Sequence, residues 1–229
     1  MSDDVEALFR DVPVLQSLTD EDRGRLLRCS YIQAFPPETT LFNEGHEVSF
    51  VLVLLAGEVE LGASLSDRCY TMMVKGAGAV FPLESCVDSG TSSYTARTLQ
   101  RCRILMIPVA FLRDLIQRNP EVTRAFLAHA AKVNRHLTME LHDQQLRAPL
   151  ERLANWIWRQ AAGGEDSQTL RLMVPKRMLA SSLGMSLTTL GREIDALRKH
   201  GVQFQDRTIR VQSVRTLAEL ANPTPHLLF

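Results

Sequence analysis

The stretch from Pro175 to Ser213 constrains the fold most, because it reads as two short helices joined by a glycine and followed by a hairpin. It predicts a helix over about Lys176–Leu183 and a turn at Gly184, where glycine takes a left-handed conformation at little cost. Ser186 is the expected N-cap of the next helix. That helix has apolar residues at i, i+4 and i+7, which are Leu190, Ile194 and Leu197. The following GVQFQDRTIRVQS predicts a two-stranded wing around Asp206–Arg207.

The opposite face of the second helix predicts a nucleic-acid interface. The helix starts without acidic residues, and its amino end carries positive dipole charge that suits phosphate. An arginine reads guanine with two hydrogen bonds, and a threonine contacts a base or the methyl group of thymine. The residues expected to face DNA are Ser186, Leu187, Thr188, Thr189, Arg192 and Lys199. With the wing, they indicate a winged helix-turn-helix rather than a small domain whose turn only connects packed helices.

Charge is divided unevenly along the chain, although the 229 residues carry no formal net charge. Residues 1–146 hold 14 Lys/Arg and 19 Asp/Glu, whereas residues 147–229 hold 12 and 7. A basic C-terminal segment suits a polyanion such as DNA. No apolar run reaches the roughly 18 residues of a membrane span, and the amino terminus lacks a signal-peptide pattern. We therefore expect a cytoplasmic protein with no membrane partner.

The middle of the chain consists of short apolar runs broken by turns. Stretches such as LFNEGHEVSFVLVLLAGEVEL and SYTARTLQRCRILMIP predict short strands that form a β-roll over about residues 31–108. A short helix closed by Asn119 and Pro120 and a long helix over about residues 120–146 follow. The expected fold is α+β. It comprises a jelly-roll-like β-roll sensor domain (residues 1–119), a dimerisation helix (120–147) and a winged helix-turn-helix domain (148–229).

The long helix carries apolar residues at near-heptad spacing. They are Phe126, Ala130, Val133, Leu137 and Leu141. A narrow stripe interrupted by a small residue is typical of a close helix–helix seam. Such a helix can cover the β-roll, pair with a second copy, or do both, and the stripe favours pairing. We therefore expect a homodimer.

The order of these parts resembles the Crp–Fnr superfamily of bacterial transcription factors, and the resemblance covers essentially the whole chain. The matching positions are Gly57, Val59 and Leu61 of the β-roll signature and Gly184, Ser186 and Arg192 of the recognition helix. The resemblance implies a homodimer that binds a two-fold symmetric site in double-stranded DNA, with half-sites about one helical turn apart. It also implies RNA polymerase as a partner.

The chain departs from this family in the cassette that binds cyclic AMP. Members that bind cyclic AMP hold it with a Gly-Glu pair and, further along, an Arg-Ser pair. The residues expected to line the effector pocket here are Pro82, Leu83, Glu84, Ser93, Tyr94 and Arg97. Pro82 and Leu83 replace Gly-Glu, and Ser93 and Tyr94 replace Arg-Ser, while Arg97 comes too late and can point elsewhere by strand alternation. We therefore expect no physiological binding of cyclic AMP.

Two further departures concern iron–sulfur chemistry and base recognition. The N-terminal cysteine cluster of the oxygen-sensing branch is missing, since the first cysteine is Cys29, and we expect no iron–sulfur cluster. Thr188 and Gly191 stand where many members carry the glutamate and serine that precede the arginine. Because threonine accepts poorly from cytosine N4, the half-site should differ from the usual family sequence at that base pair.

The sequence leaves the effector open. Haem, used to detect nitric oxide or carbon monoxide, needs an apolar slot and an axial ligand. His129 and His136 lie seven residues apart on one face of the long helix, and His129 is the first ligand we expect if haem binds. A different small ligand and a constitutive or redox-thiol protein are the alternatives.

Other functional classes lack their motifs. The chain has no Gly-rich phosphate loop, no H-E-x-x-H and no G-x-S-x-G, so we do not expect an enzyme. A regulator that responds to a cyclic nucleotide and a β-roll module that acts by protein contact are the alternatives to an effector-controlled DNA-binding regulator. The module would not bind a specific duplex.

Overall fold

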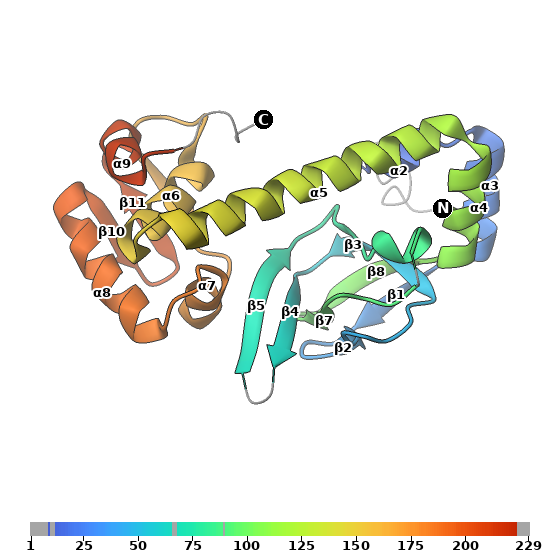
Figure 1. Cartoon of the computed structure of the whole chain (residues 1–229), viewed down its shortest axis with the longest axis horizontal. Coiled ribbons are helices and arrows are strands. Elements are labelled where there is room, and N and C mark those ends of the chain that lie inside the picture. Colours follow the sequence, from blue (N-terminus) through green and yellow to red (C-terminus); the bar gives the residue numbers. More distant parts are fainter. Residues whose placement is uncertain (1–8, 10–11, 66–67, 89, 224–229) are drawn as a thin grey trace. The chain divides into compact units, whose positions relative to one another are not determined.

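The computed structural model describes residue 9 and residues 12–65, 68–88 and 90–223. The chain divides into two compact units, residues 1–133 and 134–229, and the long helix α5 runs from one into the other (Figure 1). The fold is α+β as predicted, with a β-roll in the first unit and a winged helix-turn-helix in the second. Because the units divide within α5, the predicted boundaries at residues 119 and 147 stay a prediction.

The N-terminal unit combines two antiparallel sheets with helices. Its elements are α2 (Pro13–Gln16), α3 (Asp20–Cys29), β1 (Tyr31–Phe35), β2 (Thr40–Phe42), β3 (Phe50–Ala56), β4 (Val59–Leu65), β5 (Arg68–Lys75), β6 (Val80–Phe81), η1 (Glu84–Cys86), β7 (Thr95–Thr98), β8 (Cys102–Pro108), α4 (Val109–Arg118) and α5 (Pro120–Leu146). One sheet has the strand order β1-β8-β3-β6, and the other has the order β2-β7-β4-β5.

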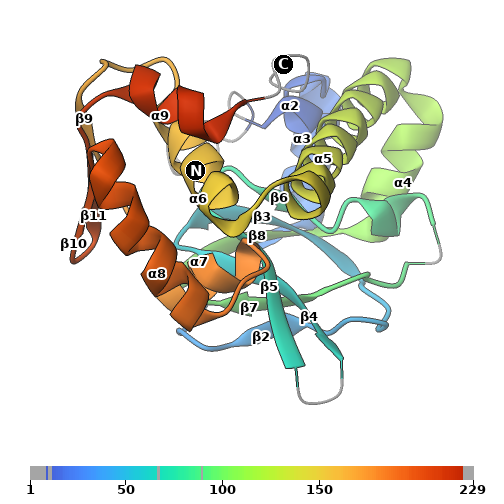
Figure 2. The same cartoon turned by 60° about the vertical axis from the view of Figure 1, so that its left-hand side comes forward.

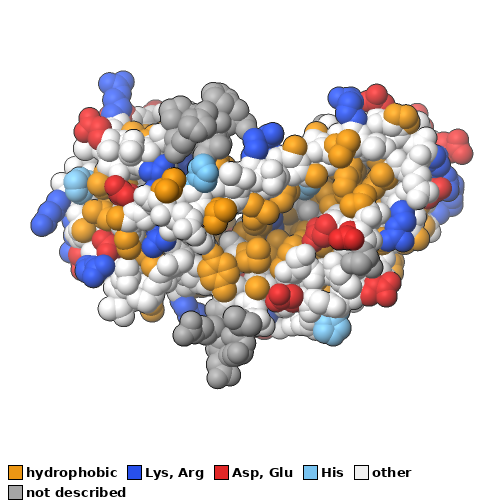
Figure 3. All heavy atoms as spheres, viewed as in Figure 1, with side chains coloured by type: hydrophobic (Ala, Val, Ile, Leu, Met, Phe, Trp, Pro, Cys, Tyr) orange, Lys and Arg blue, Asp and Glu red, His pale blue; other side chains and the backbone are white. Residues whose placement is uncertain are grey.

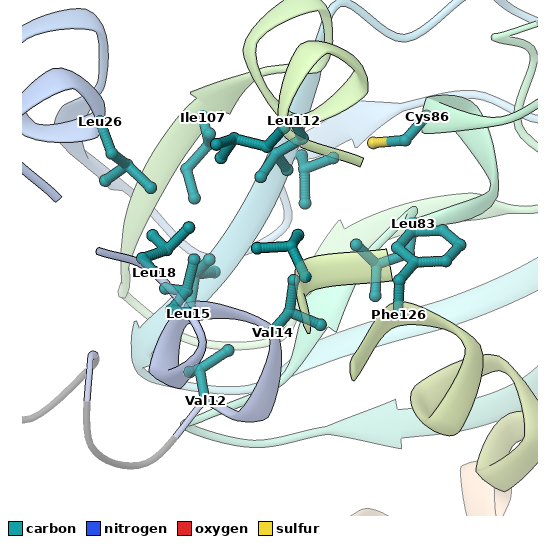
Figure 4. Close-up of a cluster of buried hydrophobic side chains, with 14 of the residues drawn as sticks. Val12, Val14, Leu15, Leu18, Leu26, Leu83, Cys86, Ile107, Leu112 and Phe126 are labelled. Atoms are coloured by element: carbon teal, nitrogen blue, oxygen red, sulfur yellow. The ribbon is translucent and has the colours of Figure 1, made fainter. Parts of the chain in front are cut away.

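Strand β3 shows why the first sheet is covered on both faces. Its sequence, FVLVLLA, is an unbroken apolar run, and successive side chains of a strand point to opposite faces. Leu52 and Leu54 enter the core between the two sheets. Val51 and Val53 enter a second core, formed with residues of α2, α3, α4 and the first turns of α5. Figure 4 shows this second core, with the ring of Phe126 beside Leu83.

This second core corrects one residue of the predicted helix–helix seam. Phe126 is 6% exposed and packs within its own unit, so it is not available to a second copy. The other predicted seam residues are exposed, as is one further leucine of the same helix; they are Ala130, Val133, Leu137, Leu141 and Leu127. Phe126 therefore leaves the predicted seam, and the other residues of the seam stay a prediction. Within the described part of the chain no helix, α5 included, is long and apolar enough to cross a membrane.

The C-terminal unit holds the predicted helix-turn-helix and its wing. Its elements after α5 are α6 (Pro149–Ala161), β9 (Gln168–Arg171), α7 (Lys176–Ser182), α8 (Leu187–Leu197), η2 (Arg198–His200), β10 (Val202–Gln205), β11 (Thr208–Val211) and α9 (Val214–Ala221). The strands form a sheet of order β10-β11-β9. Leucines and isoleucines of α6, α7, α8 and the sheet share one core, as the apolar spacing predicted.

The turn between α7 and α8 forms as the sequence predicted. Gly184 has a φ of +62°, and its amide donates to the carbonyl of Ser181 at 3.0 Å. The amide of Met185 donates to the carbonyl of Ala180, also at 3.0 Å. These two bonds make a Schellman motif, in which the left-handed position favours glycine. The turn thus ends α7 abruptly and lets the chain start α8 in a new direction.

A buried polar cluster joins the end of α5 to α6 and α9. Asp143 is 7% exposed and accepts hydrogen bonds from Arg147 at 2.7 Å and from Arg159 at 2.6 Å. The amide of Asn155 donates to both carboxylate oxygens of Asp143 at 3.0 Å. Arg147 also donates to the carbonyl of Ala221 at the end of α9. Asp143 therefore holds three elements of the C-terminal unit together.

Candidate nucleic-acid interface and effector pocket

The amino end of α8 is capped by a side chain and exposed to solvent. Ser186 is its N-cap, and the serine hydroxyl accepts from the amide of Thr189 at 3.0 Å. Ser186 and Thr189 also share a hydroxyl–hydroxyl bond of 2.9 Å. Leu187 is 53% exposed, and Thr188 is exposed beside it. Figure 2 shows α8 on the outside of the C-terminal unit, beside the β10–β11 hairpin.

Arg192 is the strongest DNA-reading candidate because a buried partner holds it in place. Its Nε and Nη2 atoms donate to one carboxylate oxygen of Glu193 at 3.0 and 2.8 Å. The side chain of Glu193 is 10% exposed, whereas that of Arg192 is 73% exposed. The carboxylate thus restrains the edge formed by Nε and Nη2, while most of the Arg192 side chain stays accessible to solvent. A fixed guanidinium loses less rotamer freedom when it binds two acceptors of a guanine.

Two of the predicted DNA-facing residues, Thr188 and Arg192, lie one turn apart on the same side of α8, and both are exposed. Lys199 is also exposed and lies in η2, which follows α8. The intervening Asp195 lies on the same face, and it is paired with Arg198 at 3.2 Å. Its negative charge is therefore partly compensated within the helix end.

Sequence reasoning missed the basic residues on the flanking elements. Lys176 and Arg177 are exposed in the first turn of α7, which has no acidic residue. Arg207 and Arg210 are exposed on the wing. The excess of Lys/Arg in residues 147–229 indicated that this segment binds a polyanion. It did not indicate which of its basic residues are exposed on the elements beside α8.

The interior of the β-roll near the predicted effector pocket is aromatic and acidic. The ring of Phe42 lies 5.8 Å from that of Tyr94 and 6.3 Å from that of Phe81, between centroids. Burial, together with the nearby carboxylate of Glu84, raises the pKa of Tyr94. Among the described residues, Glu84 Oε1 and Ser85 Oγ are buried without a hydrogen-bond partner. A phosphate would meet a carboxylate here rather than a guanidinium.

The other predicted pocket residues do not converge on this place. Pro82 is buried, Leu83 belongs to the helical core, and Ser93 is exposed. Arg97 pairs across the strands with Glu60, on the face opposite to the one that Ala96 and Leu61 fill. Its guanidinium donates to Glu38 at 2.8 Å and to Glu60 at 3.0 Å. The expectation that Arg97 lines the pocket is therefore wrong, because strand alternation places it on the outer face.

The two histidines proposed for haem lie in different environments. His129 is half-buried, and burial, together with the charges of Lys75 and Lys132, lowers its pKa, so its imidazole is neutral near neutral pH. His136 follows seven residues later and lies in the C-terminal unit. The described residues gather no group of three or more His, Cys, Asp or Glu side chains suited to a metal ion. Haem ligation by His129 stays a prediction from the sequence.

The described cysteines favour the protonated thiol. Burial raises the pKa of Cys86 to about 11. Cys102 is buried, its thiol donates to the carbonyls of Glu58 and Gln100 at 3.3 Å, and burial raises its pKa as well. Burial also raises the pKa of Cys29. Because the thiolate is the reactive form, these environments do not activate the thiols. The side chain of Cys69 lies outside the described part.

Comparisons with known proteins agree with this division of the chain. Residues 32–119 match the family described as "Cyclic nucleotide-binding domain", and residues 151–220 match the "Crp-like helix-turn-helix domain". A curated relative, the cAMP-activated global transcriptional regulator CRP of Haemophilus influenzae, is 23% identical over 81% of this chain and 85% of its own length.

Solved structures share the fold at low sequence identity. A CooA mutant from Carboxydothermus hydrogenoformans has a TM-score of 0.75 at 16% identity, covering 86% of this chain and 90% of its own. FixK2 from Bradyrhizobium japonicum has a TM-score of 0.74 at 19% identity, covering 85% and 98%. At such identities these structures establish the fold and leave the effector open.

Proposed function

Because the chain belongs to the Crp–Fnr superfamily of transcriptional regulators and carries its helix-turn-helix domain, we propose that it is a homodimer that reads a two-fold symmetric DNA site through α8. A small effector bound by the N-terminal unit controls this binding. The observation that carries the proposal is Arg192, an exposed guanidinium paired with buried Glu193 in the middle of a capped helix without acidic first-turn residues.

Each part of the C-terminal unit has a role in this proposal. Arg192 reads a guanine, and Thr188, one turn earlier on the same face, contacts the neighbouring base pair. The amino end of α8 and the basic residues of α7 and the wing contact phosphates, which fix the protein on the duplex without reading its sequence. These phosphate contacts are assigned to Lys176, Arg177, Arg207 and Arg210.

The exposed stripe of α5 supports the homodimer. Ala130, Val133, Leu137 and Leu141 continue the near-heptad spacing after Phe126, and all four are exposed in the single chain. Leu127 adds an exposed leucine to the same helix, and Figure 3 shows hydrophobic side chains gathered on the surface of the molecule in this view. A parallel pair of such helices buries the stripe and gives two recognition helices related by a two-fold axis.

The effector is proposed to be held without the phosphate contacts of a cyclic AMP cassette. The carboxylate of Glu84, close to Tyr94, occupies the region where an anion would need donors. Relatives named as cAMP-activated therefore do not supply the effector of this chain. Haem-based sensing of nitric oxide or carbon monoxide rests on His129 and His136, with His129 as the first expected ligand. An absorption spectrum recorded during haem titration tests it through the Soret band.

Binding of Arg192→Ala to a duplex that the wild-type protein selects from a random pool tests the proposal. We expect a loss of about 1–3 kcal/mol on the selected duplex, unchanged binding to a random duplex, and relaxed preference at one base pair. The reason is that the lost contacts are specific to one guanine.

Arg124→Ala is the matched control for this experiment. Arg124 is also exposed and also paired with a nearby glutamate, Glu121, at 2.6 Å, but it lies in the N-terminal unit. This control loses the same charge and should keep the affinity and the base preference. If Arg192→Ala selected and bound the same duplexes as the wild type, α8 would not read DNA as proposed.

A further inference from the structure

Gly191 lies in the middle of α8, where the fold itself does not require a glycine. Its φ is helical and not positive, and a Cβ built on it would meet no described atom within 4 Å. By contrast, Gly184 has a φ of +62°, and a Cβ on Gly57 would lie 2.6 Å from the sulfur of Cys102. A glycine inside a helix costs about 0.5–1 kcal/mol relative to alanine. The reason for Gly191 is therefore sought outside the chain.

Leu187 begins the same helix, four residues before Gly191, and it is exposed. Its side chain is 53% exposed, whereas Leu190 and Leu197 of the same helix are fully buried. Residues three or four apart are neighbours on the surface of a helix. Because helical side chains lean towards the amino end, a side chain at position 191 would fill the space beside Leu187 and Thr188. In this protein that space is open.

Leu187, Thr188 and Gly191 thus border a notch on the exposed side of α8, which is called the apolar notch below. All three residues are exposed, and none of them carries a charge. Arg192 follows directly and lies one turn after Thr188 on the same side, so the notch borders the proposed guanine reader. The carboxylate of Asp195, one turn after Gly191, is only partly compensated by Arg198 and disfavours a phosphate here. The notch therefore suits a neutral apolar group.

We propose that the apolar notch accepts the 5-methyl group of a thymine in each half-site, so that Leu187 and Gly191 determine specificity at that base pair. This inference rests on the proposed function and deepens it, because it names the base that this part of α8 recognises. Thymine carries a methyl group on its major-groove edge, and apolar side chains recognise it by contact. The absence of a Cβ at Gly191 lets the base edge approach the helix backbone closely.

Replacement of single thymines by deoxyuridine, in the duplex that the wild-type protein selects, tests the notch. Deoxyuridine keeps Watson–Crick pairing and removes only the methyl group. We expect one thymine in each half-site at which this change raises the dissociation constant about four-fold, the factor that corresponds to burying one methyl-sized group. Fluorescence anisotropy with the full-length protein measures the dissociation constants. The duplexes with thymine and with deoxyuridine at that position are called dT and dU below.

Variants of the two notch residues should change this preference in different directions. Leu187→Ala removes the apolar wall and should bind dT and dU equally well. Leu187→Met keeps an apolar side chain of similar size and should keep the preference for dT. Gly191→Ala places a methyl group where the thymine methyl lies, so it should reverse the preference and bind dU more tightly than dT.

Gly24→Ala is the matched control for Gly191→Ala. Gly24 also lies inside a helix, α3, and its Cβ would meet only the flexible end of Arg28, at 3.4 Å. Both variants should melt no lower than the wild type, because alanine favours a helix more than glycine does. Only Gly191→Ala should lose affinity for dT. A loss of affinity in a protein that is at least as stable as the wild type cannot be attributed to misfolding.

The proposal is overturned if no deoxyuridine weakens binding, or if Leu187→Ala still prefers dT as the wild type does. An equal loss of affinity by Gly191→Ala for dT, dU and a random duplex would place a phosphate in the notch and would overturn the proposal too. If Arg192→Ala loses the selected duplex while deoxyuridine has no effect, the notch falls and the regulator stands. If Arg192→Ala binds normally while Leu187→Ala loses the preference for dT, the role of Arg192 falls and the notch stands.

Discussion

The two ends of α5 treat buried charge in opposite ways. Near its start, the charges of Lys75 and Lys132 lower the pKa of His129, and none of these three side chains forms an ion pair with a described residue. Near its end, Asp143 accepts from two arginines and an asparagine. Charge that is compensated within the chain holds elements together, whereas uncompensated charge near the protein interior costs folding free energy.

The joint at the end of α5 contains more charge than Asp143 alone. Arg159 pairs with Glu140 at 3.3 Å as well as with Asp143. Burial raises the pKa of Glu140, and the positive charge of Arg159 opposes that rise without cancelling it. Arg159 thus serves two carboxylates from one turn of α6. Among the described residues, the charged side chains at this end of α5 are paired with one another. We therefore expect this end to move as one body with the winged helix-turn-helix.

Removal of Asp143 should have the largest effect of the predictions made here. Asp143→Ala leaves Arg147 and Arg159 without their main partner in a buried place, and breaking a buried pair typically costs about 3–5 kcal/mol of folding free energy. Urea unfolding followed by tryptophan fluorescence measures this cost. Both tryptophans of the chain, Trp156 and Trp158, lie in α6 of the same unit, so the signal reports that unit.

Glu121→Ala is the control on the same helix. Its pair with Arg124 is exposed on both sides, and such pairs contribute roughly 0–1 kcal/mol. If Asp143→Ala and Glu121→Ala lowered the free energy of unfolding by the same small amount, the cluster around Asp143 would not act as a joint.

A substitution in the middle of α5 should change the association of two copies rather than the folding of one chain. Leu137 is 43% exposed in the single chain, so Leu137→Glu has little to lose within the monomer. In a dimer it places two carboxylates in an apolar seam, which we expect to weaken association by roughly 2 kcal/mol or more per copy. Sedimentation velocity over a concentration series measures the shift from dimer to monomer.

Arg135→Glu is the matched control for the seam. Arg135 is exposed on the other side of α5 from Leu137, and the variant introduces the same carboxylate. It should sediment as the wild type does. If the Leu137→Glu protein stayed dimeric, neither Leu137 nor the stripe assigned with it would lie in the dimer interface.

The sequence predicted what local interactions determine. Gly184 and Ser186 follow from the geometry of a helix end and a helix start, which depend on a few neighbouring residues. Phe126 has the right heptad spacing, yet it is buried because α4 and the first sheet lie beside it, and spacing along one helix cannot reveal that. Arg97 was misplaced because strand register decides the face of each residue.

The two most informative charged residues were not predicted at all. Glu193 follows Arg192 directly and reads as one more polar residue of α8, and only its burial shows that it holds the guanidinium. Lys75 stands at the end of an apolar strand, where a lysine ordinarily turns outward. Its inward position depends on the register with β4, including a shift between Leu61 and Gly62. Both roles arise from tertiary packing, which composition and periodicity do not contain.

Replacement of Lys75 by methionine should have the smallest effect, and its sign is opposite to that of Asp143→Ala. Methionine keeps the length of the stem and removes a charge that burial disfavours, so Lys75→Met should stabilise the N-terminal unit by about 0.5–1 kcal/mol. Because the folded pKa is lowered, wild-type stability rises as the pH increases from that value towards 10.5. The charge-related part of the gain is therefore full at neutral pH and disappears above 10.5. Differential scanning calorimetry at several pH values measures it.

Lys132→Met sharpens this test. Lys132 is exposed on α5, so its replacement removes a positive charge that acts on Lys75 with less relief of burial, and it should stabilise less than Lys75→Met. If the stability difference between Lys75→Met and the wild type did not change with pH, the buried charge of Lys75 would not be its cause, and the two ends of α5 would not differ in how charge is compensated.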